Sequence, residues 1–107
     1  MKKIYKKLVR DKIPEICRQE GGVPQYQVLN PKRFGQELKN KLLEEAQELV
    51  LAKPKEIKNE IVDVYEVLLS LAKNSKISWQ KIEKFRLEKN KKRGSFKKRY
   101  FLVSNKK

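Results

Sequence analysis

The sequence predicts a mainly all-α protein of four helices, and it allows one small two-stranded β-ribbon. Charged residues and apolar residues each make up 38% of the chain, whereas average globular domains have about 25% and about 45–50%. This composition suits helices with long charged faces. Two long segments, 31–52 and 54–73, carry apolar residues at helical spacing. A length of 107 residues fits one domain over 1–107.

A short first helix is expected to start at Asp11, as its N-cap, and to run to about Glu20. Pro14 is tolerated in the first turn, and the glycines at 21 and 22 would end the helix. Residues 23–29 are too few and too β-prone for another helix, so we expect an extended segment or an edge strand there.

Asn30 and Pro31 predict the start of a long second helix, because Asn caps helices well and proline suits the first helical position. The helix should run to about Ala52, before Lys53 and Pro54 break it. Its apolar positions follow the helical repeat: Phe34, Leu38, Leu42, Ala46 and Leu49.

A third helix is expected from about Pro54 to Lys73. Its apolar residues are spaced alternately by four and three, which is typical of two paired helices: Ile57, Ile61, Val64, Leu68 and Leu71. The short connection makes it an antiparallel neighbour of the second helix.

Ser78 is expected to cap a fourth helix that runs from Trp79 to about Lys92 and ends at Gly94. The β-prone residues 99–103 could then pair with residues 23–29 as the small ribbon.

The residue types that are missing exclude several kinds of chemistry. The chain has no histidine and one cysteine, Cys17, which excludes imidazole bases, internal disulfides and the usual zinc sites. Carboxylates, lysine, arginine, tyrosine, serine, backbone groups or a hard metal ion must therefore carry any reaction. The free thiol, the lack of a secretion signal and the lack of a membrane-length apolar run predict a cytoplasmic protein without a membrane partner.

The net charge of +15 predicts an anionic partner, but the charge is unevenly distributed. Residues 73–107 contain 14 Lys and Arg against 2 acids, a net of +12. Residues 37–66 contain 8 acids against 5 lysines, a net of −3. The chain thus carries an acidic island within a basic frame.

Within the acidic island, Glu45 with Glu48 and Glu60 with Asp63 are two i, i+3 pairs. Both pairs border the apolar seam, so antiparallel helices would bring four carboxylates together. Such a group needs a cation, and oxygen ligands select Mg²⁺, Mn²⁺ or Ca²⁺. The alternative is that these acids are solvated helix faces paired with surface lysines, namely Lys41, Lys53 or Lys58.

Five sequence strings extend this pattern across most of the chain. They are KLVRDKIP at 7–14, LKNKLLEEAQEL at 38–49, EIVD at 60–63, DVYEV at 63–67 and KNKKRGSF at 89–96. Their E-E-x-x-E … E-x-x-D core and their order resemble the all-α nucleoside triphosphate pyrophosphohydrolases of the MazG-like superfamily. The likeness is to the small single-domain, phosphoribosyl-ATP pyrophosphohydrolase-like branch.

The resemblance implies a four-helix MazG-like bundle and a house-cleaning hydrolase. It would cleave standard or non-canonical nucleoside triphosphates to nucleoside monophosphate and pyrophosphate with Mg²⁺, or with Mn²⁺ as a substitute. The metal ligands would be Glu45, Glu48, Glu60 and Asp63. Catalysis would involve Glu44, Glu45 and Glu48, with Glu44 orienting the attacking water or a ligand. Related enzymes act as oligomers, so a homodimer or homotetramer is expected.

A triphosphate carries about four negative charges, so the site also needs cations. Within the motifs, Arg10, Lys89 and Arg93 are the expected phosphate-binding residues, with Lys41 as a second choice.

The alternative function is a basic nucleic-acid-binding module that uses residues 73–107. The high positive charge predicts weak, salt-sensitive, non-specific binding to nucleic acid whatever the fold. The sequence has no zinc-finger or glycine-aromatic RNA motif, and this alternative leaves the concentration of acids at 44–63 unexplained.

Overall fold

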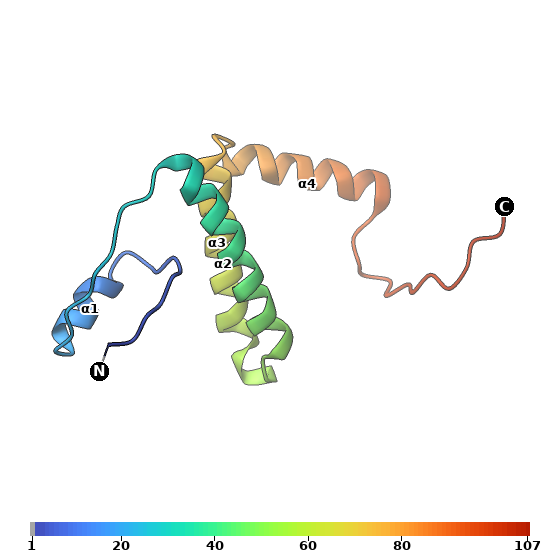
Figure 1. The fold of residues 1–107 in the computed structure, drawn as a ribbon. Coiled ribbons are helices and arrows are strands. Elements are labelled where there is room, and N and C mark those ends of the chain that lie inside the picture. The colour runs from blue at the N-terminus through green and yellow to red at the C-terminus, as the bar shows by residue number, and fades with distance from the viewer. Residues whose placement is uncertain (1) are drawn as a thin grey trace. The chain divides into compact units, whose positions relative to one another are not determined.

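The computed structural model describes residues 2–107, which form four α-helices and one 3₁₀ turn (Figure 1). The helices are α1 (Ile13–Gln19), α2 (Pro31–Leu51), α3 (Ile57–Asn74) and α4 (Trp79–Arg93), and the turn η1 (Pro54–Glu56) joins α2 to α3. Residues 2–107 contain no strand, so the all-α class is confirmed.

The small ribbon is a wrong prediction. The structure has no strand at residues 23–29 or 99–103, and most of their apolar side chains are open to solvent, with Val28 93% and Phe101 89% exposed. β-propensity expresses packing against neighbouring strands. Two short segments that bury so little apolar surface have little to stabilise their pairing.

Helix α1 differs from its prediction at the N-terminus. Its N-cap is Lys12, and no side chain caps the helix, so the cap assigned to Asp11 is wrong. The backbone carbonyl of Arg10 instead accepts from the amide of Ile13 at 3.0 Å, which satisfies the donor that a cap would have served. The helix ends before Gly21, whose φ of +88° suits glycine.

Helices α2 and α3 form an antiparallel hairpin, and their ends lie close to the predicted ones (Figure 1). The side chain of Asn30 accepts from the amide of Arg33 at 2.8 Å, which confirms the predicted cap. At the turn, the amide of Lys53 donates to Glu56 Oε1 at 2.8 Å. The third helix, predicted from Pro54, is a 3₁₀ turn that continues as α3.

Packing between α2 and α3 buries Leu38, Val67 and Ala72. At the open end of the hairpin the amide group of Asn74 donates to the carbonyl oxygen of Pro31 at 3.1 Å. A Cβ placed on Gly35 would lie 2.9 Å from Asn74 Nδ2, so glycine allows the two helices to approach closely there. These contacts fix the register, which places Glu45 opposite Glu60 and Asp63 at the other end.

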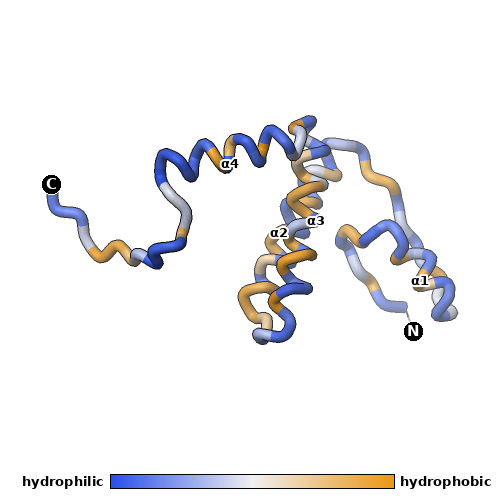
Figure 2. Tube along the Cα trace, turned by 180° about the vertical axis from the view of Figure 1, so that it is seen from behind, coloured by the Kyte–Doolittle hydropathy of each residue, from blue (hydrophilic) through white to orange (hydrophobic). Residues whose placement is uncertain are grey.

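Many apolar side chains of this hairpin remain exposed, and hydrophobic colour runs along both helices in Figure 2. Leu43 is 72% exposed on α2, and Ile61 is 51% exposed on α3. Leu43 precedes Glu45 by two positions, and Ile61 precedes Asp63 by two positions. Two positions turn a side chain about 160° around an α-helix, so each apolar residue points away from its acid. The hairpin therefore has an acidic side and an apolar side.

The chain divides into two compact units, one ending at Lys76 and the other spanning Ile77–Lys107. The second unit contains α4, where Ser78 Oγ accepts from the amide of Lys81 at 3.2 Å. The helix ends at Gly94, whose φ is +82°. Both predicted boundary residues of α4 are confirmed. In residues 2–107, none of the helices combines the length and apolarity needed to cross a bilayer.

Candidate metal centre

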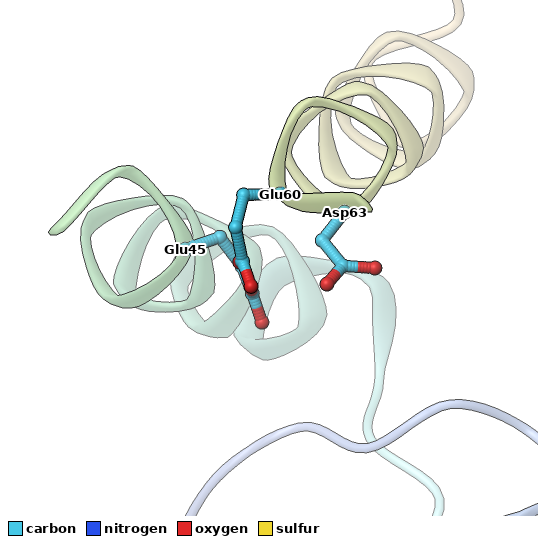
Figure 3. Close-up of side chains that lie close together, drawn as sticks. All are labelled: Glu45, Glu60 and Asp63. Atoms are coloured by element: carbon cyan, nitrogen blue, oxygen red, sulfur yellow. The ribbon is translucent and has the colours of Figure 1, made fainter. Parts of the chain in front are cut away.

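Three carboxylates of the acidic island converge between α2 and α3 (Figure 3). Glu45 comes from α2, and Glu60 and Asp63 come from α3. One carboxylate oxygen from each lies within 4.8 Å of the others. The prediction that the two antiparallel helices bring acids of the island together is therefore confirmed for these three residues.

Two oxygens of this cluster are buried without compensation. Glu45 is only 8% exposed, and its Oε2 has no hydrogen-bond partner within residues 2–107; the same holds for Oε2 of Glu60. A buried carboxylate oxygen without a partner lowers the free energy of unfolding, by roughly 1–3 kcal/mol in mutational data. Such oxygens fit the ligand set of a hard cation.

Two basic side chains contact the cluster. Lys41 Nζ lies 3.3 Å from Glu45 Oε1 and 3.5 Å from Glu44 Oε1. Arg10 Nη2 lies 2.8 Å from Asp63 Oδ1. The structure thus brings two of the predicted phosphate-binding residues, Arg10 and Lys41, to the acids themselves.

Lys7 is a site residue that the sequence analysis missed. Its Nζ donates to Glu44 Oε1 at 3.2 Å. Lys7 lies three positions before Arg10 in the same N-terminal string, so that string held a signal for it. With 28 lysines and arginines in the chain, spacing alone did not distinguish this lysine from the solvated ones.

Glu44 remains an anion beside the cluster. Burial raises its pKa, but the hydrogen bond from Lys7 and the charges of Lys41 and Lys7 outweigh that effect and hold its pKa below the ordinary value. The same hydrogen bond raises the pKa of Lys7. Glu44 lies outside the group of three close oxygens, and its role in orienting water stays a prediction.

Glu48 lies next to the cluster and is exposed. The hydrogen bond with Glu45 and the negative charge of Glu45 raise the pKa of Glu48, with smaller effects from burial, Glu60 and Glu44. Its carboxylate is not among the three that lie within 4.8 Å of one another. Its role as a fourth ligand stays a prediction.

Lys89 and Arg93 lie on α4, in the second unit. Lys89 Nζ lies 5.8 Å from the centre of the Phe85 ring, and Arg93 is the last residue of the helix. Their assignment to phosphate binding stays a prediction.

This donor set has a definite chemical preference. Carboxylate oxygens without imidazole or thiolate suit Mg²⁺, Mn²⁺ or Ca²⁺. Mg²⁺ commonly binds through a few carboxylates, waters and substrate phosphate oxygens. The cluster with its flanking cations can therefore hold a divalent ion on one side and an anionic ligand on the other. A comparison of the chain with protein-family models, curated proteins and solved structures found no match.

Proposed function

We propose that this chain is a Mg²⁺-dependent nucleoside triphosphate pyrophosphohydrolase with a house-cleaning role in the cytoplasm. The observation that carries the proposal is the cluster of Glu45, Glu60 and Asp63, in which the buried Oε2 atoms of Glu45 and Glu60 have no partner in the described chain. Arg10 and Lys41 pair with acids of that cluster and Lys7 pairs with the adjacent Glu44, which supplies the positive charge that a polyphosphate needs. The likeness of the sequence strings to MazG-like enzymes supplies the reaction.

The reaction cleaves the bond between the α- and β-phosphates, with water as the nucleophile, and releases a nucleoside monophosphate and pyrophosphate. When bound, Mg²⁺ would neutralise phosphate charge and acidify water. Glu45, Glu60 and Asp63, with Glu48 beside them, would hold the ion. Glu44, kept anionic by its lysine partners, would accept a hydrogen bond from the attacking water.

Arg10 and Lys41 have a second task in this proposal. Both side chains form ion pairs with carboxylates of the cluster. A triphosphate competes for them, because a guanidinium pairs well with phosphate oxygens. Arg10 would then pass from Asp63 to the substrate as the ion takes its place.

We also propose that the chain acts as a homodimer or larger homo-oligomer through the apolar side of the hairpin. Val50 is 81% exposed on α2, and Leu68 is 38% exposed on α3. Leu43 and Ile61 are exposed on the same two helices, and exposed apolar side chains in such number are typical of an interface. A second copy of the same face would cover it by two-fold symmetry.

The test is pyrophosphate release from a panel of standard and non-canonical nucleoside triphosphates with Mg²⁺ or Mn²⁺. Glu60→Gln and Asp63→Asn should each lower the rate by at least about 100-fold, because losing even a supporting group of a metal site costs 10–100-fold. Glu88→Gln, an exposed position on α4, is the matched control and should keep full activity. Absence of release from every triphosphate by the wild type would refute the proposal.

A second candidate function is non-specific nucleic-acid binding by the second unit. Residues 77–107 contain 12 Lys and Arg against 2 acids, and the last turn of α4 holds Lys91, Lys92 and Arg93. Under this alternative, Glu60→Gln leaves DNA affinity unchanged, whereas Lys91→Glu with Lys92→Glu removes it.

A further inference from the structure

A cavity of about 460 Å³ lies next to the carboxylate cluster, between residues 8–16 and the α2–α3 hairpin. All of its lining residues belong to the first unit. Its volume is within the range of about 300–1,000 Å³ that small-molecule sites have. Glu45 and Asp63 line it, so the cavity and the metal cluster are continuous.

The residues of α2 that line the cavity change from charged to apolar along the helix. Glu45, Lys41, Leu38 and Phe34 all face the cavity and follow one another at steps of four, three and four residues. These steps keep one helix face and span about 16 Å. The cavity therefore runs from a charged end at Glu45 to an apolar end at Phe34.

The other walls carry both charged and apolar residues. Along α3, Asp63 and Glu66 precede Val67 and Ser70 in the lining. The N-terminal segment contributes Arg10, Asp11 and Lys12 together with apolar residues such as Ile13 and Ile16. A ligand that fits this lining is anionic at one end and carries a ring that buries apolar surface at the other.

We infer that this cavity is the nucleoside subsite of the enzyme: the base packs against Phe34 and Leu38 while the phosphates lie at Arg10 and Lys41. The inference rests on the proposed function for the place of the phosphates. An aromatic ring at the far end suits a base, because every base offers a flat face for stacking. The hydroxyl of Ser70 lines the cavity from α3 near that end, and it can donate to or accept from the base edge.

The test measures binding, so that it does not depend on catalysis. The full chain is titrated with Mg²⁺ and the 5′-monophosphates of adenosine, guanosine, cytidine, uridine, thymidine and inosine, followed by calorimetry. Ribose 5-phosphate, which has the same phosphate and no base, is the reference. At least one nucleoside monophosphate should bind about 10-fold more tightly than ribose 5-phosphate, as expected for one stacked base.

Two variants tie that difference to the cavity. Phe34→Leu should remove most of the 10-fold advantage, and Phe85→Leu on α4 is the matched control that should keep it. Ser70→Leu fills the cavity without removing packed atoms, so it tests the same point if Phe34→Leu fails to fold. Both variants should leave the affinity for ribose 5-phosphate unchanged.

The outcomes separate this inference from the proposed function. If triphosphates are hydrolysed but no base improves binding over ribose 5-phosphate, the subsite is refuted and the enzyme stands. The same conclusion follows if both cavity variants keep the advantage. If the base effect is found and lost in the variants while no triphosphate is cleaved, the subsite stands and the proposed reaction is wrong.

Discussion

Glu60 contributes a buried oxygen without a hydrogen-bond partner, next to two other carboxylates. In the absence of a cation this arrangement works against folding, since neighbouring anions repel and buried polar atoms lose their hydration. Residues that lower stability at a candidate site often serve function, because activity there commonly requires groups that destabilise the fold.

We therefore expect Glu60→Gln to stabilise the metal-free protein. The neutral amide removes one buried charge and can donate to a neighbouring carboxylate, which should add about 1 kcal/mol to the free energy of unfolding. Thermal melting in a chelator measures this, with Glu88→Gln expected within about 0.5 kcal/mol of wild type. With Mg²⁺ at 100 times its dissociation constant the order should reverse, since the wild type gains about 2.7 kcal/mol. A lower melting temperature of Glu60→Gln in chelator would contradict the expectation.

Arg10 should have opposite effects on metal and nucleotide. Its guanidinium lies 2.8 Å from Asp63 Oδ1 and competes with an ion for that oxygen. Both side chains are partly exposed, so the pair contributes at most about 1 kcal/mol. Arg10→Ala should thus tighten Mg²⁺ binding by up to about fivefold without nucleotide, and raise the KM for the triphosphate.

Calorimetry with Mg²⁺ alone and steady-state kinetics measure the two effects of Arg10→Ala separately. Arg18→Ala, which breaks the ion pair with Glu15 on α1, is the matched control and should change neither. Equal weakening of both binding steps would mean that Arg10 only supports the fold.

At the scale of elements, helix ends were the most predictable features. Asn30 and Ser78 cap α2 and α4 as their residue types predict, because the cap is made within four residues of sequence. Asp11 failed as a cap because a backbone turn had already satisfied the first amide of α1. The β-prone residues 99–103 failed because strand pairing depends on a distant partner.

The residues of the candidate site also divide into those that local spacing predicts and those that it does not. Glu45, Glu60 and Asp63 were predictable, because i, i+3 spacing and an antiparallel hairpin fix their neighbourhood. The contacts of Lys7 and Arg10 were not, since the N-terminal segment reaches the hairpin through tertiary packing over 37 and 53 residues of sequence. No local rule encodes a contact of that length.

Asn30→Ala should cost the first unit about 1 kcal/mol of stability, because the amide of Arg33 loses its acceptor. Urea denaturation followed by circular dichroism measures the change. Gln47→Ala, at an exposed position of the same helix, should remain within about 0.5 kcal/mol of wild type. Equal stabilities for the two variants would show that the cap contributes nothing.

At the scale of the whole molecule, the apolar side of the hairpin should determine the assembly. We expect light scattering after size exclusion to give at least twice the chain mass of 12.7 kDa. Ile61→Glu places a charge in the apolar face and should return the particle to a single chain. Val23→Glu, at a position that is 91% exposed outside the helices, is the control and should keep the wild-type mass. A wild-type mass of one chain would refute the oligomer.

The pairing of Arg10 with Asp63 has a consequence for the order in which ligands bind. Under the proposed function, a phosphate that draws Arg10 away would free an oxygen of Asp63 for the ion, so the nucleotide would strengthen metal binding. Thermodynamic reciprocity then requires the metal to strengthen nucleotide binding by the same factor. The chain would bind Mg²⁺ up to about fivefold more weakly while idle, and ion and nucleotide would each favour the binding of the other, as one heterotropically coupled pair.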